Sequence, residues 1–137
     1  METAGPVARA KEMKVQIAPE INELDFGEWN GATFDRLKTD PRWAAWNQHR
    51  SVVRMPGGEI MSEVQSRAVA FLEKLNAQNP KGKFALFSHG DVIRAVICYF
   101  LGMPLDLLPR VDVEPASISI VQLAEGGPRI IAVNRME

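Results

Sequence analysis

The chain has 137 residues and a formal net charge of −1, and this length suits one domain with a hydrophobic core. Hydrophobic residues make up 46% and charged residues 24%, and no basic block points to nucleic acid or to a membrane surface. The most apolar run is much shorter than the ~20 residues of a membrane-spanning helix. The single cysteine, Cys98, lies in an apolar run and is expected to be a buried, inert thiol, which fits a reducing cytoplasm.

The first third of the chain predicts a helix, a strand and a loop. Residues 2–13 are expected to be helical, and the alternation of Val15 and Ile17 predicts a short strand. Residues 25–31 are rich in turn-forming types and predict a loop.

The next segment carries most of the aromatic residues. Thr33 is placed to cap a short helix that runs through Leu37, and Pro41 is expected at the first position of another helix. That second helix carries Trp43 and Trp46. These tryptophans, with Trp29 and Phe34, either pack into the core or form the wall of a substrate pocket.

The clearest predicted helix runs from Met61 to Leu75. Its apolar residues recur at steps of three and four, with charged and polar residues between them. The segment 56–58 interrupts the chain before this helix, and the segment 79–82 ends it.

The last part of the chain alternates between strands and helices. Residues 84–87 form a continuous apolar run that predicts a strand buried on both faces, and a helix to Leu101 follows it, with Gly102 as its C-terminal cap. Two further strands, 118–123 and 130–133, are expected to form a hairpin. This alternation predicts an α/β fold in which helices cover both faces of a sheet.

His89 is the leading candidate for chemistry. It stands between Ser88 and Gly90, where the predicted buried strand leads directly into a helix. Ligands of α/β sheets bind at such strand ends, and the free N–H groups of a new helix attract an anion such as phosphate. The alternative is that His89 caps the helix or packs under a loop.

Glu23 is the second candidate, because it precedes a glycine-rich loop and lies close to Asp25 and Glu28. A carboxyl group in a partly apolar pocket can act as a general acid, whereas the alternative is a solvated acidic loop. His49 is expected on a helix surface, and Arg94 is expected to form a structural ion pair.

Other chemistries lack their motifs. The chain has no phosphate-binding Gly-x-x-x-x-Gly-Lys loop, no dinucleotide-binding Gly-x-Gly-x-x-Gly and no Gly-x-Ser-x-Gly elbow. Two isolated histidines and one cysteine make a zinc site an unsuitable interpretation.

Three motifs together resemble those of the histidine phosphatase superfamily, which is phosphoglycerate-mutase-like. Residues 22–31 resemble the loop of the proton donor, residues 56–59 resemble the segment that opens the long helix, and residues 87–94 resemble the second histidine motif. Ile60 stands where serine is common in the family. The resemblance implies a three-layer α/β/α sandwich over residues 1–137, here lacking the first strand and helix.

The resemblance also implies a reaction. Family members hydrolyse phosphomonoesters or move phosphoryl groups through a phosphohistidine, and no metal or organic cofactor is implied. Carried onto this sequence, His89 is the second, phosphate-contacting histidine, Glu23 is the proton donor, and the Gly90 backbone lies beside the phosphate. The expected partner is a small phosphorylated metabolite, and hydrolysis is favoured over mutase chemistry.

The family's arginine-histidine-glycine motif, which holds the nucleophile, does not occur in the 137 residues. Glu2-Thr3-Ala4 resembles a helix segment that follows that motif in the family, so we expect an N-terminally truncated, partial domain that is inactive alone. A missing central strand would expose unpaired edges, and we expect poor stability or self-association through such an edge. The alternative function is a non-catalytic remnant that binds phosphate or a partner.

Overall fold

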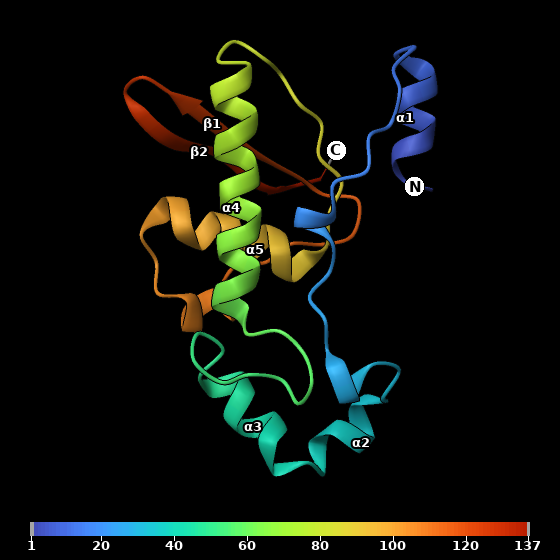
Figure 1. Ribbon diagram of the computed structural model, residues 1–137, viewed down its shortest axis with the longest axis vertical. Coiled ribbons are helices and arrows are strands. Elements are labelled where there is room, and N and C mark those ends of the chain that lie inside the picture. Colours follow the sequence, from blue (N-terminus) through green and yellow to red (C-terminus); the bar gives the residue numbers. More distant parts are fainter. Residues whose placement is uncertain (1, 137) are drawn as a thin grey trace.

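A computed structural model of the protein describes residues 2–136. Two long helices form its centre (Figure 1). Helix α4 (Met61–Gln78) runs along the molecule and helix α5 (Gly90–Leu101) crosses behind it. Strands β1 (Ile118–Ala124) and β2 (Gly127–Arg135) pair as an antiparallel hairpin beside these helices. The predicted helices and hairpin are therefore confirmed, although β2 begins three residues earlier than expected.

The ends of the two long helices follow from local chemistry. At the start of α4, the Glu63 carboxylate accepts a hydrogen bond from the backbone N–H of Ile60 at 3.2 Å. At the end of α5, Gly102 has φ +63°, which glycine adopts without steric cost, and the Met103 N–H donates back to the Cys98 carbonyl at 2.9 Å. The predicted cap at Gly102 is confirmed.

Two short helices form a smaller unit below the central pair (Figure 1). Helix α2 (Phe34–Lys38) begins after Thr33, whose hydroxyl accepts from the Arg36 N–H, and helix α3 (Pro41–Gln48) begins with its proline at the first position. Both predicted starts are confirmed. The chain enters this unit through the 3-10 turn η2 (Gly27–Trp29).

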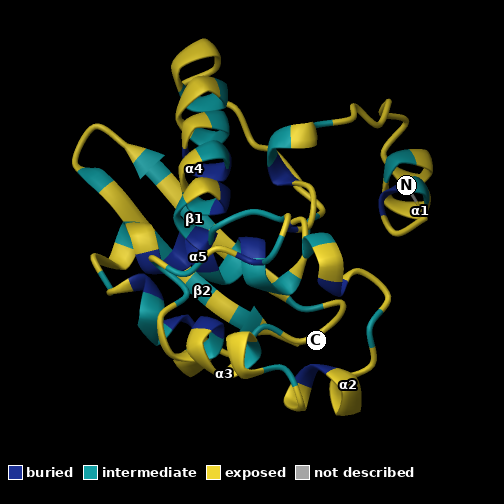
Figure 2. Cartoon of the chain, turned by 60° about the horizontal axis from the view of Figure 1, so that its bottom comes forward, coloured by how far each residue is buried: buried dark blue, intermediate teal, exposed yellow. Residues whose placement is uncertain are grey.

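The N-terminal segment is largely exposed. Helix α1 (Ala4–Ala10) is set apart from the rest of the molecule and is largely exposed (Figure 2). The chain then runs without regular structure to the 3-10 turn η1 (Pro19–Ile21), which packs on α4.

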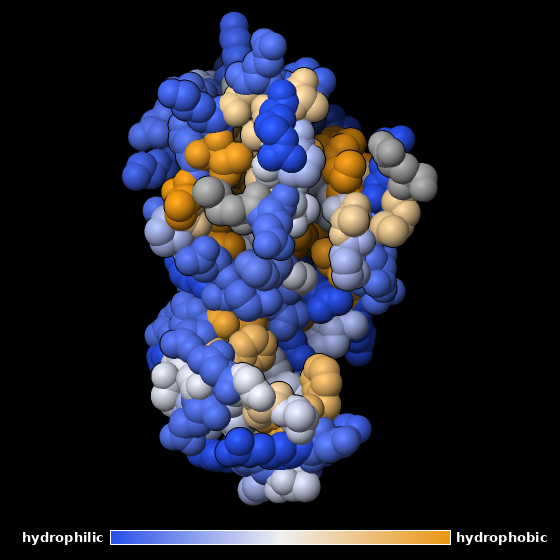
Figure 3. Space-filling view, turned by 90° about the vertical axis from the view of Figure 1, so that its right-hand side faces the viewer, coloured by the Kyte–Doolittle hydropathy of each residue, from blue (hydrophilic) through white to orange (hydrophobic). Residues whose placement is uncertain are grey.

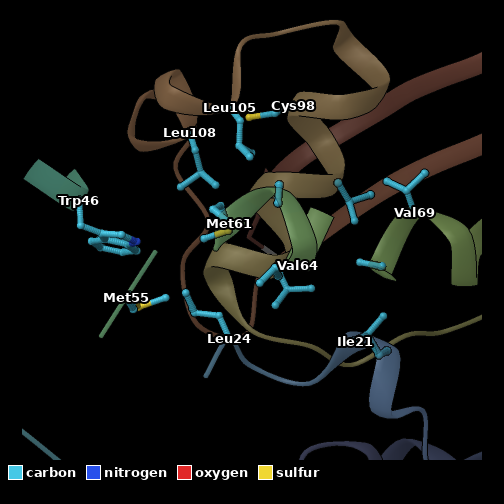
Figure 4. Close-up of a cluster of buried hydrophobic side chains, with 14 of the residues drawn as sticks. Ile21, Leu24, Trp46, Met55, Met61, Val64, Val69, Cys98, Leu105 and Leu108 are labelled. Atoms are coloured by element: carbon cyan, nitrogen blue, oxygen red, sulfur yellow. The ribbon is translucent and has the colours of Figure 1, made fainter. Parts of the chain in front are cut away.

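The core lies where α4, α5 and the 3-10 helix η3 (Leu105–Arg110) meet (Figure 4). Its buried side chains include those of Met55, Met61, Val64, Ala68, Val92, Ala95, Cys98 and Leu108. Cys98 is fully buried, as expected, and burial raises the pKa of its thiol. Within residues 2–136 no helix is both long enough and apolar enough to span a bilayer.

The two strands predicted before the hairpin are not formed. Among the described residues, the one sheet is the β1–β2 pair, and segments 14–18 and 83–88 are extended without a ladder. Ile17, in the first of these segments, is 75% exposed. Phe84, in the second, is 48% exposed, so the expectation that residues 84–87 are buried on both faces is wrong. An apolar run becomes a buried strand only where neighbouring strands supply hydrogen bonds, and none does so here.

Candidate functional site

The two predicted catalytic side chains lie together. Glu23 Oε2 is 3.5 Å from His89 Nδ1, although they come from distant parts of the chain. The side chains are 39% and 53% exposed, so a solute can reach both groups. The pair brings a carboxyl group and an imidazole within the range of proton exchange.

His89 directly precedes α5 and occupies its N-cap position with an extended backbone. Its side chain makes no capping hydrogen bond, and it is half exposed, so neither the capping nor the packed alternative describes it. The preceding residue is fixed, because the Ser88 hydroxyl donates to the Ile21 carbonyl at 2.7 Å. The imidazole therefore projects from an anchored backbone while its own ring remains available.

The start of α5 supplies further donors beside His89. Within residues 2–136, no protein acceptor takes the backbone N–H groups of Gly90, Asp91 or Val92. A helix N-terminus with free N–H groups carries a partial positive charge that favours an anion. A Cβ at Gly90 would lie 3.8 Å from its nearest neighbour, which is ordinary contact, so internal packing does not require glycine there.

Burial makes Glu23 a weaker acid than a fully exposed glutamate, by raising the pKa of its carboxyl group. Burial is the main influence, and it raises the pKa of this carboxyl group above its ordinary value. Asp91 raises the pKa as well, while the Leu24 N–H at 3.0 Å, His89 and Arg67 act in the opposite direction. The net shift is upward, toward the range in which a carboxyl group can donate a proton.

A titration should separate Glu23 from an exposed acid on the same fold. We expect the carboxyl carbon of Glu23 to titrate above 4.5, whereas that of Glu63, which is hydrogen-bonded to Arg54, should titrate at about 2. Carbon-detected NMR across the acidic range measures both. Coincident titration curves would contradict the expected desolvation of Glu23.

The pKa shifts of Glu23 and Glu63 affect the pH dependence of folding stability in opposite directions. Because the pKa of Glu23 is raised on folding, its contribution to stability is full below 4.5 and is lost as pH rises through the folded value. The lowered pKa of Glu63 gives a contribution that is present above 4.5 and is lost as pH falls toward 2.

A cluster of charged side chains lies at the first turn of α5. Arg94 donates to the Asp91 carboxylate at 2.9 Å and to the Val111 carbonyl at 2.8 Å, which confirms the expected structural ion pair. Asp91 also accepts from Arg50 at 3.2 Å, and the Arg50 guanidinium lies 4.1 Å from the ring centre of Trp46. The sequence does not single out Arg50, because nothing in its spacing connects it with Asp91.

The tryptophans form a packed cluster. Trp46 is 1% exposed and Trp29 is 6% exposed, and the ring of Trp43 stacks on that of Trp46 with centres 5.3 Å apart. The Trp29 indole N–H donates to Asp40 at 3.1 Å. Core packing is therefore confirmed for Trp46, and Trp29 packs in the core and also lines a hollow.

Two of the hollows among the described residues are lined by neither Glu23 nor His89. One of about 220 Å³ lies against Trp29 and α2, and one of about 540 Å³ lies between the hairpin and the ends of α4 and α5. His49 is exposed after the end of α3, as expected. Residues 2–136 contain no group of three or more histidine, cysteine or acidic side chains placed to hold a metal ion.

The sequence pattern of the histidine phosphatase superfamily (branch 1) matches residues 1–136. The chain therefore belongs to this superfamily, and the resemblance carried by its three motifs is confirmed.

The chain is similar to known proteins over nearly its whole length. Phosphoserine phosphatase 1 of Hydrogenobacter thermophilus is 28% identical over 134 residues, which are 96% of this chain and 64% of that protein. The structure of YhfR from Bacillus stearothermophilus superposes with a TM-score of 0.91 at 22% identity, covering 99% of this chain and 69% of that one. A mycobacterial glucosyl-3-phosphoglycerate phosphatase in complex with inorganic phosphate superposes with a TM-score of 0.80 at 22% identity, covering 98% and 71%.

These matches confirm the expected fold class, a phosphoglycerate-mutase-like α/β fold. They also show that relatives of the chain are phosphatases, and that a protein of the same fold binds inorganic phosphate. The chain spans 64% of the length of the phosphoserine phosphatase that it matches.

Proposed function

We propose that these residues form the acid-donor and phosphate-binding part of a phosphomonoester hydrolase that works through a phosphohistidine. The observation that carries this proposal is the pair of Glu23 and His89, 3.5 Å apart, beside the N-terminus of α5. The pair combines a carboxyl group of raised pKa with donors suited to a phosphoryl group.

In the proposed reaction, a nucleophilic histidine attacks phosphorus while His89 and the Gly90 N–H hold the phosphoryl oxygens. Glu23 gives its proton to the leaving oxygen as the phosphorus–oxygen bond breaks. Water then attacks the phosphohistidine, and the Glu23 carboxylate takes a proton from that water. Inorganic phosphate leaves, and the acid is restored for the next cycle.

We propose that neither histidine of this sequence is the nucleophile. His89 takes the second position of the family scheme, and His49 lies exposed after the end of α3. We therefore propose that the 137 residues alone do not turn over substrate. Activity is tested in a completed chain, by which we mean this sequence joined to a family first strand that carries the arginine-histidine-glycine motif.

Replacing Glu23 by Gln in the completed chain should impair poor leaving groups most. Turnover of phenyl phosphate should fall by about a hundredfold, because general acid catalysis contributes about 10²–10⁴ in rate. Turnover of 2,4-dinitrophenyl phosphate should fall only a few-fold, since that leaving group needs little protonation. Steady-state kinetics on both substrates check this, and equal losses would show that Glu23 is no proton donor.

The proposed substrate class agrees with a site built to contact phosphate. We propose a small phosphorylated metabolite in the cytoplasm, where a free thiol such as Cys98 persists, and no metal or organic cofactor enters the scheme. Hydrolysis is favoured over mutase chemistry, because the sequence contains no long insertion to retain a phosphorylated intermediate.

A second candidate function, partner binding without catalysis, is favoured by one observation. The extended segments 14–18 and 83–88 expose Ile17, Phe84 and Leu86, and Figure 3 shows apolar groups open on this side of the molecule. If phosphate binds without turnover even in the completed chain, this candidate replaces the hydrolase.

The 137-residue chain should associate with itself at micromolar concentration through these extended segments. Apolar exposure and unpaired backbone groups along them favour pairing with another copy. Sedimentation velocity across a hundredfold range of concentration measures this. Replacing Phe84 and Leu86 by Lys should reduce association, and a monomer with a sharp cooperative melt would contradict the proposal.

A further inference from the structure

The segment that carries Glu23 has no regular secondary structure and lies between η1 and η2. Its Glu23 backbone is therefore not fixed by a helix or strand ladder. A catalytic acid must nevertheless hold its carboxyl group within a few tenths of an ångström of the leaving oxygen. The contacts that fix this segment come from side chains elsewhere in the fold.

Arg67, on α4, contacts both this segment and the η1 turn that precedes it. Its Nη1 donates to the Glu20 carbonyl at 2.7 Å, and its Nη2 is 3.3 Å from the Glu23 carbonyl. The side chain is 23% exposed, so these bonds are partly shielded from water. A planar guanidinium fixes both carbonyl groups at once, which a lysine ammonium cannot do with the same geometry.

Glu59 completes the arrangement from the other side. Arg67 donates to the two carboxylate oxygens of Glu59 at 2.9 and 3.0 Å. The Glu59 carboxylate accepts from the Asp25 N–H at 2.9 Å, and the Glu59 N–H donates to the Asp25 carbonyl at 2.9 Å. The backbone is thus held both at Glu23 and immediately beyond it.

The sequence pattern alone places Arg67 among the polar residues between the apolar positions of α4. The structure instead directs it toward the Glu23 segment, together with a carboxylate from the turn before the helix. The orientation here is set by four acceptors that lie outside α4.

We propose that Arg67, aligned by Glu59, is a positioning residue that holds Glu23 where its proton reaches the leaving oxygen. This inference rests on the proposed function, and it adds residues that do not touch the substrate. Loss of Arg67 should leave phosphate binding at His89 intact and impair the proton transfer. The effect should therefore fall on kcat for poor leaving groups rather than on KM.

The test is kinetic, in the completed chain. Arg67→Gln should lower kcat for phenyl phosphate by about tenfold or more, but kcat for 2,4-dinitrophenyl phosphate by less than about threefold. Arg67→Lys should recover little of the loss. In a Glu23→Gln background, adding Arg67→Gln should change kcat for phenyl phosphate by less than about twofold, because both substitutions remove one function.

Arg54 provides the matched control. It also bonds a carboxylate, that of Glu63, and a backbone carbonyl, that of Gly58, but the structure records no bond from it to residues 20–25. Arg54→Gln should slow both substrates to the same small extent. A circular dichroism melt of each variant corrects kcat for the folded fraction.

The outcomes are distinct. An inactive completed wild type overturns the proposed function and this inference with it. An active wild type whose Arg67→Gln variant slows both substrates equally, or whose losses multiply with those of Glu23→Gln, overturns the positioning role alone. A loss confined to phenyl phosphate and absent from the Glu23→Gln background supports it.

Discussion

Replacing His89 by Ala in the completed chain should lower kcat by at least about a hundredfold for phenyl phosphate and 2,4-dinitrophenyl phosphate alike. The imidazole is proposed to contact the phosphoryl oxygens, whose charge must be stabilised whatever group leaves, and loss of one such donor costs about 10²–10³ in rate. Steady-state kinetics on both substrates measure the effect. The absence of leaving-group dependence distinguishes His89 from Glu23.

The control for this substitution is His49→Ala. His49 is exposed after α3, and its loss should leave kcat within about twofold. Stability should hardly change in either variant, because the His89 side chain is half exposed and makes no capping bond. Rates near those of the wild type for His89→Ala would remove His89 from the mechanism.

Gly58→Ala should destabilise the fold strongly, although it adds only one methyl group. A Cβ at Gly58 would lie 2.2 Å from the Asp25 carbonyl oxygen, a distance at which the backbone must move. The two segments approach each other equally closely at Gly27, where a Cβ would lie 2.2 Å from the Pro56 carbonyl oxygen. We expect a loss of about 2–4 kcal/mol in the free energy of unfolding, measured by urea denaturation.

Alanine substitutions at two other glycines distinguish the steric clash at Gly58 from the cost of placing a non-glycine residue in a left-handed backbone conformation. Gly31 has φ +72° and open space around its Cβ position, so Gly31→Ala should cost only about 1–2 kcal/mol, the penalty of the left-handed backbone. Gly126 has open space and no positive φ, so Gly126→Ala should cost the least of the three. If Gly58→Ala were as mild as Gly126→Ala, the close approach of the two segments would be wrong.

Most helices could be predicted from local sequence, because their signals act over a few residues. The apolar period of α4, the proline that opens α3 and the glycine that ends α5 each fix a boundary without help from distant segments. The hairpin was predicted for the same reason, since its two strands lie beside each other in sequence.

The extended segments could not be predicted in this way. Residues 84–87 have the composition of a buried strand, yet whether they enter a ladder depends on partners elsewhere in the chain. In the described residues no such partner is present, and the segment has no regular secondary structure.

The residues of the candidate site also differ in whether local sequence reveals them. Glu23 and His89 could be singled out because each lies in a motif of neighbouring residues. Arg67, which contacts the Glu23 segment, and Arg50, which contacts Asp91, could not, because nothing in their local sequence connects either arginine with its distant partner.

The proposed acid and the proposed phosphate-binding histidine are each attached to a different helix. Glu23 is held from α4 through Arg67, His89 is the residue before α5, and the two helices are bonded directly where the Gln65 amide donates to the Ala95 carbonyl at 2.8 Å. The gap between the reacting groups is therefore inherited from the way two core helices pack. A core substitution of one methyl group between the two helices would shift their packing and so change the distance over which the proton is transferred. Substitutions in the core, and not only those at the site, therefore alter the rate of the proposed reaction.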